Sequence, residues 1–139
     1  MKGGSMRKII TVSVCSVLLA AGLAWGQDIS VKSMPPSVVK TVPQSGDTTV
    51  DATVTKQITV TFSKDMMDRS WSWSQISEET FPEIVGKPRY LDDKKTCVVD
   101  VKLKPKKTYV LWLNSQKFRG FQDADGNPAV PYLLVFQTK

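Results

Sequence analysis

Apolar and polar residues alternate along most of the chain after residue 35, which is the pattern expected of β-strands. The clearest case is the stretch 57–62, where Ile58, Val60 and Phe62 fall on one side and polar residues fall on the other. Such alternation predicts a half-buried antiparallel strand. The same reasoning predicts strands at 37–42, 57–62, 70–74, 89–91, 96–103, 108–114 and 132–137. Seven short strands with turn residues between them predict an all-β sandwich with Greek-key connections.

The segment 75–88 breaks this alternation. Its residues 77–79 permit one short helical turn, but Pro82 and Pro88 exclude a long helix because proline lacks the N–H that a helix interior requires. No other part of the domain has a helical period long enough to suggest an α/β fold. We therefore expect an irregular connection in an all-β domain, with apolar residues at Ile76, Phe81, Pro82 and Ile84.

A tyrosine near the start of the expected sixth strand narrows the fold class. Leu103, Pro105 and Tyr109 have the spacing Leu-x-Pro-x-x-x-Tyr. In Greek-key sandwiches of the immunoglobulin-like (Ig-like) kind, such a tyrosine turns its hydroxyl toward upstream backbone and fixes a corner. Pro105 would stiffen the crossing, and Leu103 would cover the core beneath it. We therefore expect an Ig-like Greek-key sandwich with a structural corner at these three residues.

The N-terminal 26 residues have a different pattern. Arg7 and Lys8 precede an apolar run at 9–23, and small residues precede Gln27. This pattern predicts a secretory signal peptide at 1–26, cleaved after Gly26, although an uncleaved anchor is the alternative. The run is shorter than a membrane span of about 20 residues, so we expect no stable span after cleavage. A linker at 27–34 and one sandwich domain at 35–139 would follow, in the periplasm or outside the cell.

Charge adds little once the signal peptide is set aside. The chain has 19 basic and 13 acidic residues and a formal net charge of +6. Three of the basic residues lie in the signal peptide, so 16 remain against 13 acidic ones, a net charge of +3. The one lysine cluster alternates with apolar residues, which predicts the solvated face of a strand rather than a nucleic-acid-binding surface. It consists of Lys102, Lys104, Lys106 and Lys107.

Histidine is absent from the whole chain. This excludes Ser-His-Asp and Cys-His nucleophile systems as well as histidine metal sites. Cys97 is the only cysteine left after cleavage, so no intrachain disulfide forms, and we expect a buried, inert thiol. Carboxylates such as Asp65 and Glu83 remain, but a domain of this size has little room for the cleft that glycoside hydrolysis needs. We therefore expect no enzymatic activity and no cofactor.

Short motifs occur in a characteristic order along the mature chain. They are Pro35-Pro36, Val38-Val39, the Pro43-to-Gly46 turn, Phe62-Ser63-Lys64-Asp65-Met66, the tyrosine corner, the Asp123-to-Pro128 hairpin and Phe136-Gln137-Thr138. Together they resemble the bacterial Ig-like domain of the SbsA type, found in S-layer and other exported proteins. The resemblance implies an exported, non-catalytic module and no particular ligand. Two departures are that such domains usually occur in tandem, and that the segment 71–89 is longer and richer in tryptophan and proline.

The candidate binding surface consists of the three tryptophans left after cleavage, Trp71, Trp73 and Trp112. Alternation places Trp71 and Trp73 on one side of their strand and Trp112 on the outer side of the strand at 108–114. Exposed aromatic patches mark interaction sites, and flat indole rings suit sugar rings or proline-rich segments. Either the irregular segment 75–88 covers the outer face and the tryptophans are structural, or a partner covers it.

One further pattern concerns metal binding. Asp123, Asp125 and Asn127 place oxygen ligands at alternate positions, as at the start of a calcium loop. However, Gly126 comes fourth rather than sixth, and no bidentate glutamate follows at the twelfth position. An ordinary turn is the alternative explanation.

These features together predict an exported, monomeric, non-catalytic module with a binding or structural role at the cell envelope or in the secreted space. Its partner would be a protein or glycan of the envelope, and not a nucleic acid. The alternative is a carbohydrate-binding module that uses the same surface tryptophans.

Overall fold

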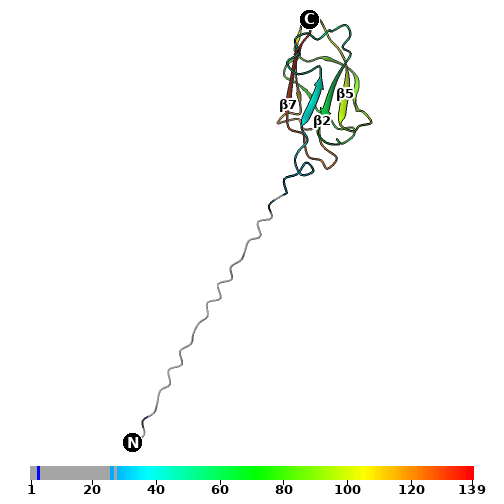
Figure 1. Ribbon diagram of the computed structural model, residues 1–139. Helices are drawn as coiled ribbons and strands as arrows, with labels where there is room; N and C mark the ends of the chain where they lie inside the picture. The colour runs from blue at the N-terminus through cyan, green and yellow to red at the C-terminus, as the bar shows by residue number, and fades with distance from the viewer. Residues whose placement is uncertain (1–2, 4–25, 27) are drawn as a thin grey trace.

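The computed structural model describes Gly3, Gly26 and residues 28–139. The predicted signal peptide therefore lies almost entirely outside the described residues. Seven strands form two antiparallel sheets, which confirms the predicted all-β sandwich (Figure 1). The strands are β1 (Val38–Val42), β2 (Gln57–Phe62), β3 (Trp73–Gln75), β4 (Glu83–Tyr90), β5 (Thr96–Lys102), β6 (Thr108–Leu113) and β7 (Tyr132–Gln137).

The two sheets have the strand orders β1-β2-β5-β4 and β3-β6-β7. This is the arrangement of the constant-type Ig sandwich, in which strands A, B, E and D face strands C, F and G. Neighbouring strands pair antiparallel throughout, so each strand presents alternate side chains to the core and to solvent. In the described part of the chain, no helix is both long and apolar enough to cross a membrane.

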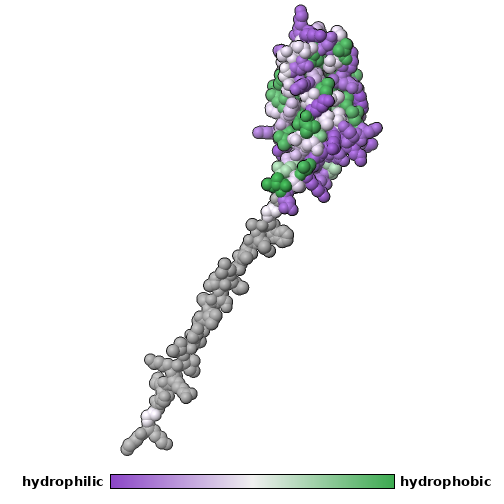
Figure 2. All heavy atoms as spheres, viewed as in Figure 1, coloured by the Kyte–Doolittle hydropathy of each residue, from purple (hydrophilic) through white to green (hydrophobic). Residues whose placement is uncertain are grey.

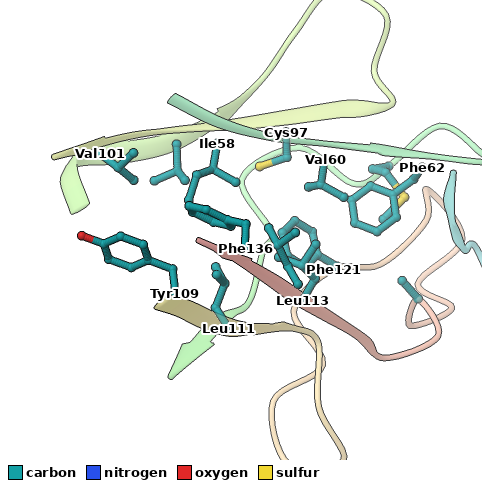
Figure 3. Packing of buried hydrophobic residues seen from close by; sticks show 14 of the residues in the cluster. Ile58, Val60, Phe62, Cys97, Val101, Tyr109, Leu111, Leu113, Phe121 and Phe136 are labelled. Atoms are coloured by element: carbon teal, nitrogen blue, oxygen red, sulfur yellow. The ribbon is translucent and has the colours of Figure 1, made fainter. Parts of the chain in front are cut away.

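The core lies between the inner faces of the two sheets (Figure 3). Ile58 and Val60 of β2 face Leu111 and Leu113 of β6, and all four side chains are fully buried. Phe121, from the loop after β6, packs among them, with its ring centroid 4.9 Å from that of Phe62. Burying one such side chain stabilises a fold by roughly 1.5–3 kcal/mol. Because Cys97 is the only described cysteine and is unpaired, this packing must hold the domain without a disulfide.

Two strands differ from their predicted bounds. β3 begins at Trp73 rather than at residue 70, and β4 covers Glu83–Tyr90 rather than only 89–91. The pairing of β4 with β5 is interrupted between Val85 and Arg89, where Gly86 has a φ of 73° and Pro88 follows. Proline and glycine are tolerated there because β4 is an edge strand with a bulge. Strand therefore covers residues 83–88 of the segment 75–88, and the irregular connection that we expected is confined to residues 76–82, with a turn at 78–80.

The described chain enters and leaves the sandwich at opposite poles (Figure 1). The segment 28–34 forms a turn in which the N–H of Met34 donates to the carbonyl of Ser30. Apolar surface is visible at this pole in Figure 2, and Ile29 and Val31 are exposed there. Lys139 lies at the far pole, where its backbone N–H donates to the carbonyl of Val50.

Candidate functional site

The structural corner forms where β5 crosses to β6. The hydroxyl oxygen of Tyr109 accepts a hydrogen bond from the backbone N–H of Lys104, 2.8 Å away. The Tyr109 ring is buried and stacks on Phe136 at a centroid distance of 5.3 Å. Leu103 packs against the core, whereas Pro105 is exposed. The corner is therefore a scaffold element that fixes the connection between the two sheets.

Asp123, the first of the three candidate calcium ligands, is buried and already surrounded by donors. One carboxylate oxygen accepts the backbone N–H groups of Asp125 and Asn127, at 3.0 and 2.9 Å. The other accepts the Asn127 side-chain amide at 2.9 Å and the Lys64 ammonium at 2.6 Å. Asp125 itself is exposed.

Lys64 occupies the position in which a metal ion would neutralise Asp123. Its ammonium also donates to the backbone carbonyls of Lys32 and Met34, at 3.0 and 2.9 Å, so all three of its protons are used. No group of three acidic, cysteine or histidine side chains suited to a metal ion occurs among the described residues. The calcium-like spacing therefore forms an ion-paired turn that ties the segment 28–34 to the sandwich.

The electrostatics of Asp123 follow from these contacts. Burial alone would raise its pKa, but the hydrogen bonds from Lys64 and Asn127 outweigh it and lower the pKa of Asp123 to about 2. The carboxylate therefore stays ionised at neutral pH. This pair joins two of the short motifs, the Phe62-to-Met66 stretch and the Asp123-to-Pro128 hairpin.

The three tryptophans do not share one face. Trp73 pairs directly with Leu113, so its side chain points into the core, where its ring lies edge-on to Phe121 with centroids 5.5 Å apart. Trp112 pairs with Ser74 and Leu133, so it lies on the outer face of the three-stranded sheet. The register of β3 therefore places Trp73 and Trp112 on opposite faces of the sheet, so these two side chains do not form one joint surface. A tryptophan on strand C is a core residue in Ig domains, and this signal could have assigned Trp73 from the sequence.

The indole N–H of Trp73 is buried and has no hydrogen-bond partner of normal geometry. Its side chain adjoins the Cys97 thiol. Burial raises the pKa of Cys97 to about 12, and the nearby Trp73 offsets only part of this rise. The thiol is therefore protonated at neutral pH and is not a nucleophile.

Phe81 and Ile84 of the segment 75–88 pack against the core at the lateral edge where β3 faces β4. Trp112 is half-buried, and its neighbour Leu133 is exposed.

An open groove of about 550 Å³ follows this lateral edge. Trp71 and Phe118 form its aromatic end, and Ser72, Ser74 and Gln75 provide hydroxyl and amide groups along one wall. The opposite wall is formed by Phe81, Ile84 and Pro88. Trp71 and Trp73 of the predicted binding surface both line this groove while packing against the core, and Trp112 is not among its lining residues.

Phe118 was not among the predicted site residues, although it is 52% exposed. The turn that presents it is fixed by two hydrogen bonds, from the N–H of Ser115 to the Phe118 carbonyl and from the N–H of Phe118 to the Ser115 hydroxyl. Gly120 lies against Trp71, and a Cβ there would overlap the Trp71 carbonyl. An aromatic residue within the polar stretch 115–119 was the sequence signal that could have identified it.

Comparisons with known proteins give one family match and two similar solved structures. A family model described as a bacterial Ig-like domain matches residues 32–138. Comparison with the curated proteins gave no match. Among solved structures, surface layer protein SbsC (domains 1–6) is similar over 76% of this chain and 14% of its own, with 18% identity and a TM-score of 0.48. The crystal structure of the S-layer protein rSbsC(31-844) is similar over 75% of this chain and 14% of its own, with 17% identity and a TM-score of 0.48. The chain therefore corresponds to a small part of those proteins.

Proposed function

The chain belongs to the bacterial Ig-like domain family, and on that premise we propose that it is an exported, non-catalytic module that binds a protein or glycan of the cell envelope. The motif order described above supports the SbsA type within that family. The N-terminal pattern supports a signal peptide at 1–26 and a mature protein in the periplasm or outside the cell. N-terminal sequencing of the exported protein should then give Gln27 as the first residue. Retention of the apolar run would contradict this part of the proposal.

The single observation that carries the binding role is the groove with Trp71 and Phe118 at its aromatic end. An exposed aromatic residue held on a hydrogen-bonded turn loses little conformational freedom when it binds, which favours recognition. Elsewhere, two edge strands are protected against unspecific pairing with strands of other chains. β7 is covered by the segment 44–47, where Gly46 donates to Val135, and β4 carries its bulge and Pro88.

The test replaces Phe118 with alanine and measures binding to panels of envelope glycans and proline-rich peptides. Phe118→Ala removes an exposed ring and should leave folding unchanged. Leu133→Ala is the matched control, because it removes an exposed apolar side chain from the outer face of the three-stranded sheet, where it does not line the groove. Binding that Phe118→Ala weakens and Leu133→Ala does not would support the groove. Equal affinities of both variants would contradict it.

A second candidate is a structural spacer, and the observation that favours it is the placement of the two ends of the described chain at opposite poles (Figure 1). Such a domain extends a chain rather than folding it back. A spacer role does not depend on the groove. An envelope phenotype of a deletion that Phe118→Ala complements fully would favour the spacer over the binding module.

A further inference from the structure

The aromatic groove continues into a second hollow of about 560 Å³ along the same edge of the sandwich. Gln75 and Phe81 line both hollows, so together they form one track from the loop after β6 to the corner between β5 and β6. The far end is lined by three lysines from that corner and by two glutamates. These residues are Lys102, Lys104, Lys107, Glu78 and Glu83.

The charges at the far end are unequally paired. Lys102 lies 3.5 Å from Glu83 and is neutralised by it. Lys104 and Lys107 form no ion pair within residues 28–139, and the Lys107 ammonium lies over the Tyr109 ring at 5.2 Å. The track thus has aromatic rings at one end and hydroxyl and amide groups along it. At the other end are the ammonium groups of Lys104 and Lys107 and the carboxylate of Glu78, none of which forms an ion pair within residues 28–139.

We propose that this track binds a carboxylated polysaccharide, a chain of uronate-type sugars, and this rests on the proposed binding function of the same groove. The Lys117 ammonium lies over one face of the Phe118 ring, 5.3 Å from its centroid, so the other face of Phe118, together with Trp71, would stack on sugar rings. Ser72, Ser74 and Gln75 would exchange hydrogen bonds with sugar hydroxyls. Lys104 and Lys107 would pair with carboxylates farther along the chain.

The charge pattern selects this ligand over other anionic polymers. Two unpaired lysines match a polymer with one charge per sugar residue. Glu83 is engaged by Lys102, but Glu78 lines the same stretch without an ion pair among residues 28–139 and would repel a densely sulfated chain. A neutral glycan would leave both ammonium groups without a partner, which forfeits the attraction that they offer.

An extended protein strand fits the track less well. The β4 wall is interrupted by the bulge between Val85 and Arg89, and Pro88 has no N–H to donate. β3 offers only three residues, Trp73–Gln75, for pairing with an added strand. A peptide would therefore gain few main-chain hydrogen bonds.

The experiment measures binding of the mature chain to sodium polygalacturonate by affinity electrophoresis and calorimetry, with dextran and dextran sulfate as neutral and densely charged comparisons. We expect polygalacturonate to bind best, with an affinity that falls as salt is raised from about 50 to about 500 mM. Phe118→Ala and the double variant Lys104→Gln/Lys107→Gln should each weaken binding about tenfold or more. The charge-matched control is Lys94→Gln/Lys95→Gln, which lies in the turn between β4 and β5, at the other end of β5 from the corner, and does not line either hollow.

Equal losses for the two lysine pairs would mean attraction by net charge alone and would overturn the inference. Stronger binding of dextran sulfate or dextran would also overturn it. If a proline-rich peptide binds instead and Phe118→Ala abolishes that binding, the carboxylated ligand is wrong while the binding function stands. If neither polymers nor peptides bind and Phe118→Ala has no effect in any assay, both proposals fail together. Circular dichroism of each variant checks that the sandwich is folded.

Discussion

Lys64→Met measures how much of the domain's stability depends on the ammonium buried beside Asp123. Methionine keeps an unbranched stem of similar length, so the packing of the side chain changes little. It removes the three hydrogen bonds that Lys64 donates to Asp123, Lys32 and Met34. The two carbonyls belong to exposed residues and regain water, so the main loss is at Asp123.

The size of that loss follows from burial. The side chains of Lys64 and Asp123 are only 12% and 2% exposed. Breaking a buried pair by removing one partner costs about 3–5 kcal/mol, because the other charge stays desolvated. Asp123 keeps three donors from Asp125 and Asn127, which places the expected cost near the lower end, at about 3 kcal/mol. For a domain of this size, that corresponds to a fall in Tm of about 10 °C.

Urea unfolding followed by tryptophan fluorescence gives the free energy directly. Lys102→Met is the matched control, because it breaks an ion pair with Glu83 in which both side chains are mostly exposed. It should change the unfolding free energy little. A double-mutant cycle with Asp123→Asn should show coupling of about 1–3 kcal/mol. A loss below about 0.5 kcal/mol for Lys64→Met, or no coupling, would refute the assignment of Lys64 as the internal counter-ion.

Three further predictions concern Asp123, Tyr109 and Cys97. Because the pKa of Asp123 is lowered from 3.8 to about 2, its carboxylate stabilises the fold by about 2 kcal/mol at pH values above 3.8. This contribution should be lost in acid-unfolding curves as pH falls from about 4 to 2. A flat stability profile over that range would contradict it. Tyr109→Phe leaves the N–H of Lys104 without its acceptor and should cost about 1–2 kcal/mol in the same urea assay, and an unchanged midpoint would mean that the corner is held by packing alone. Cys97, with a pKa of about 12, should react with a disulfide reagent at pH 8 only after unfolding, and rapid modification of the native protein would show that the thiol is accessible.

The alternation of apolar and polar residues along the chain was enough to predict most of the strands. Five of the seven strands lie within about a residue of their predicted bounds, because side chains that alternate between core and solvent leave a period of two in the sequence. The corner spacing at Leu103, Pro105 and Tyr109 also has a local cause, since one loop must cross between sheets. Strand β4 was predicted too short, because its bulge at Gly86–Pro88 interrupts the period and an edge position tolerates the proline.

The candidate site needed pairings between distant segments. Alternation placed Trp71 and Trp73 on one side of their strand, but only the pairing of Trp73 with Leu113 shows that this side faces the core. The register therefore places Trp73 and Trp112 on opposite faces of the three-stranded sheet. A strand's own pattern does not say which of its two faces is covered when both carry apolar residues.

The calcium-like spacing has the same explanation. Asp123, Asp125 and Asn127 are close in sequence, and the turn that they form is local. The cation that pairs with Asp123 is the ammonium of Lys64, which lies 59 residues earlier in the chain. The sequence by itself determined the strands, the corner and the absence of histidine chemistry, because these depend on neighbours along the chain. The tertiary structure alone decided the inner position of Trp73, the Lys64–Asp123 pair and the groove between β3 and β4, because each brings together residues whose contact depends on how the two sheets pack.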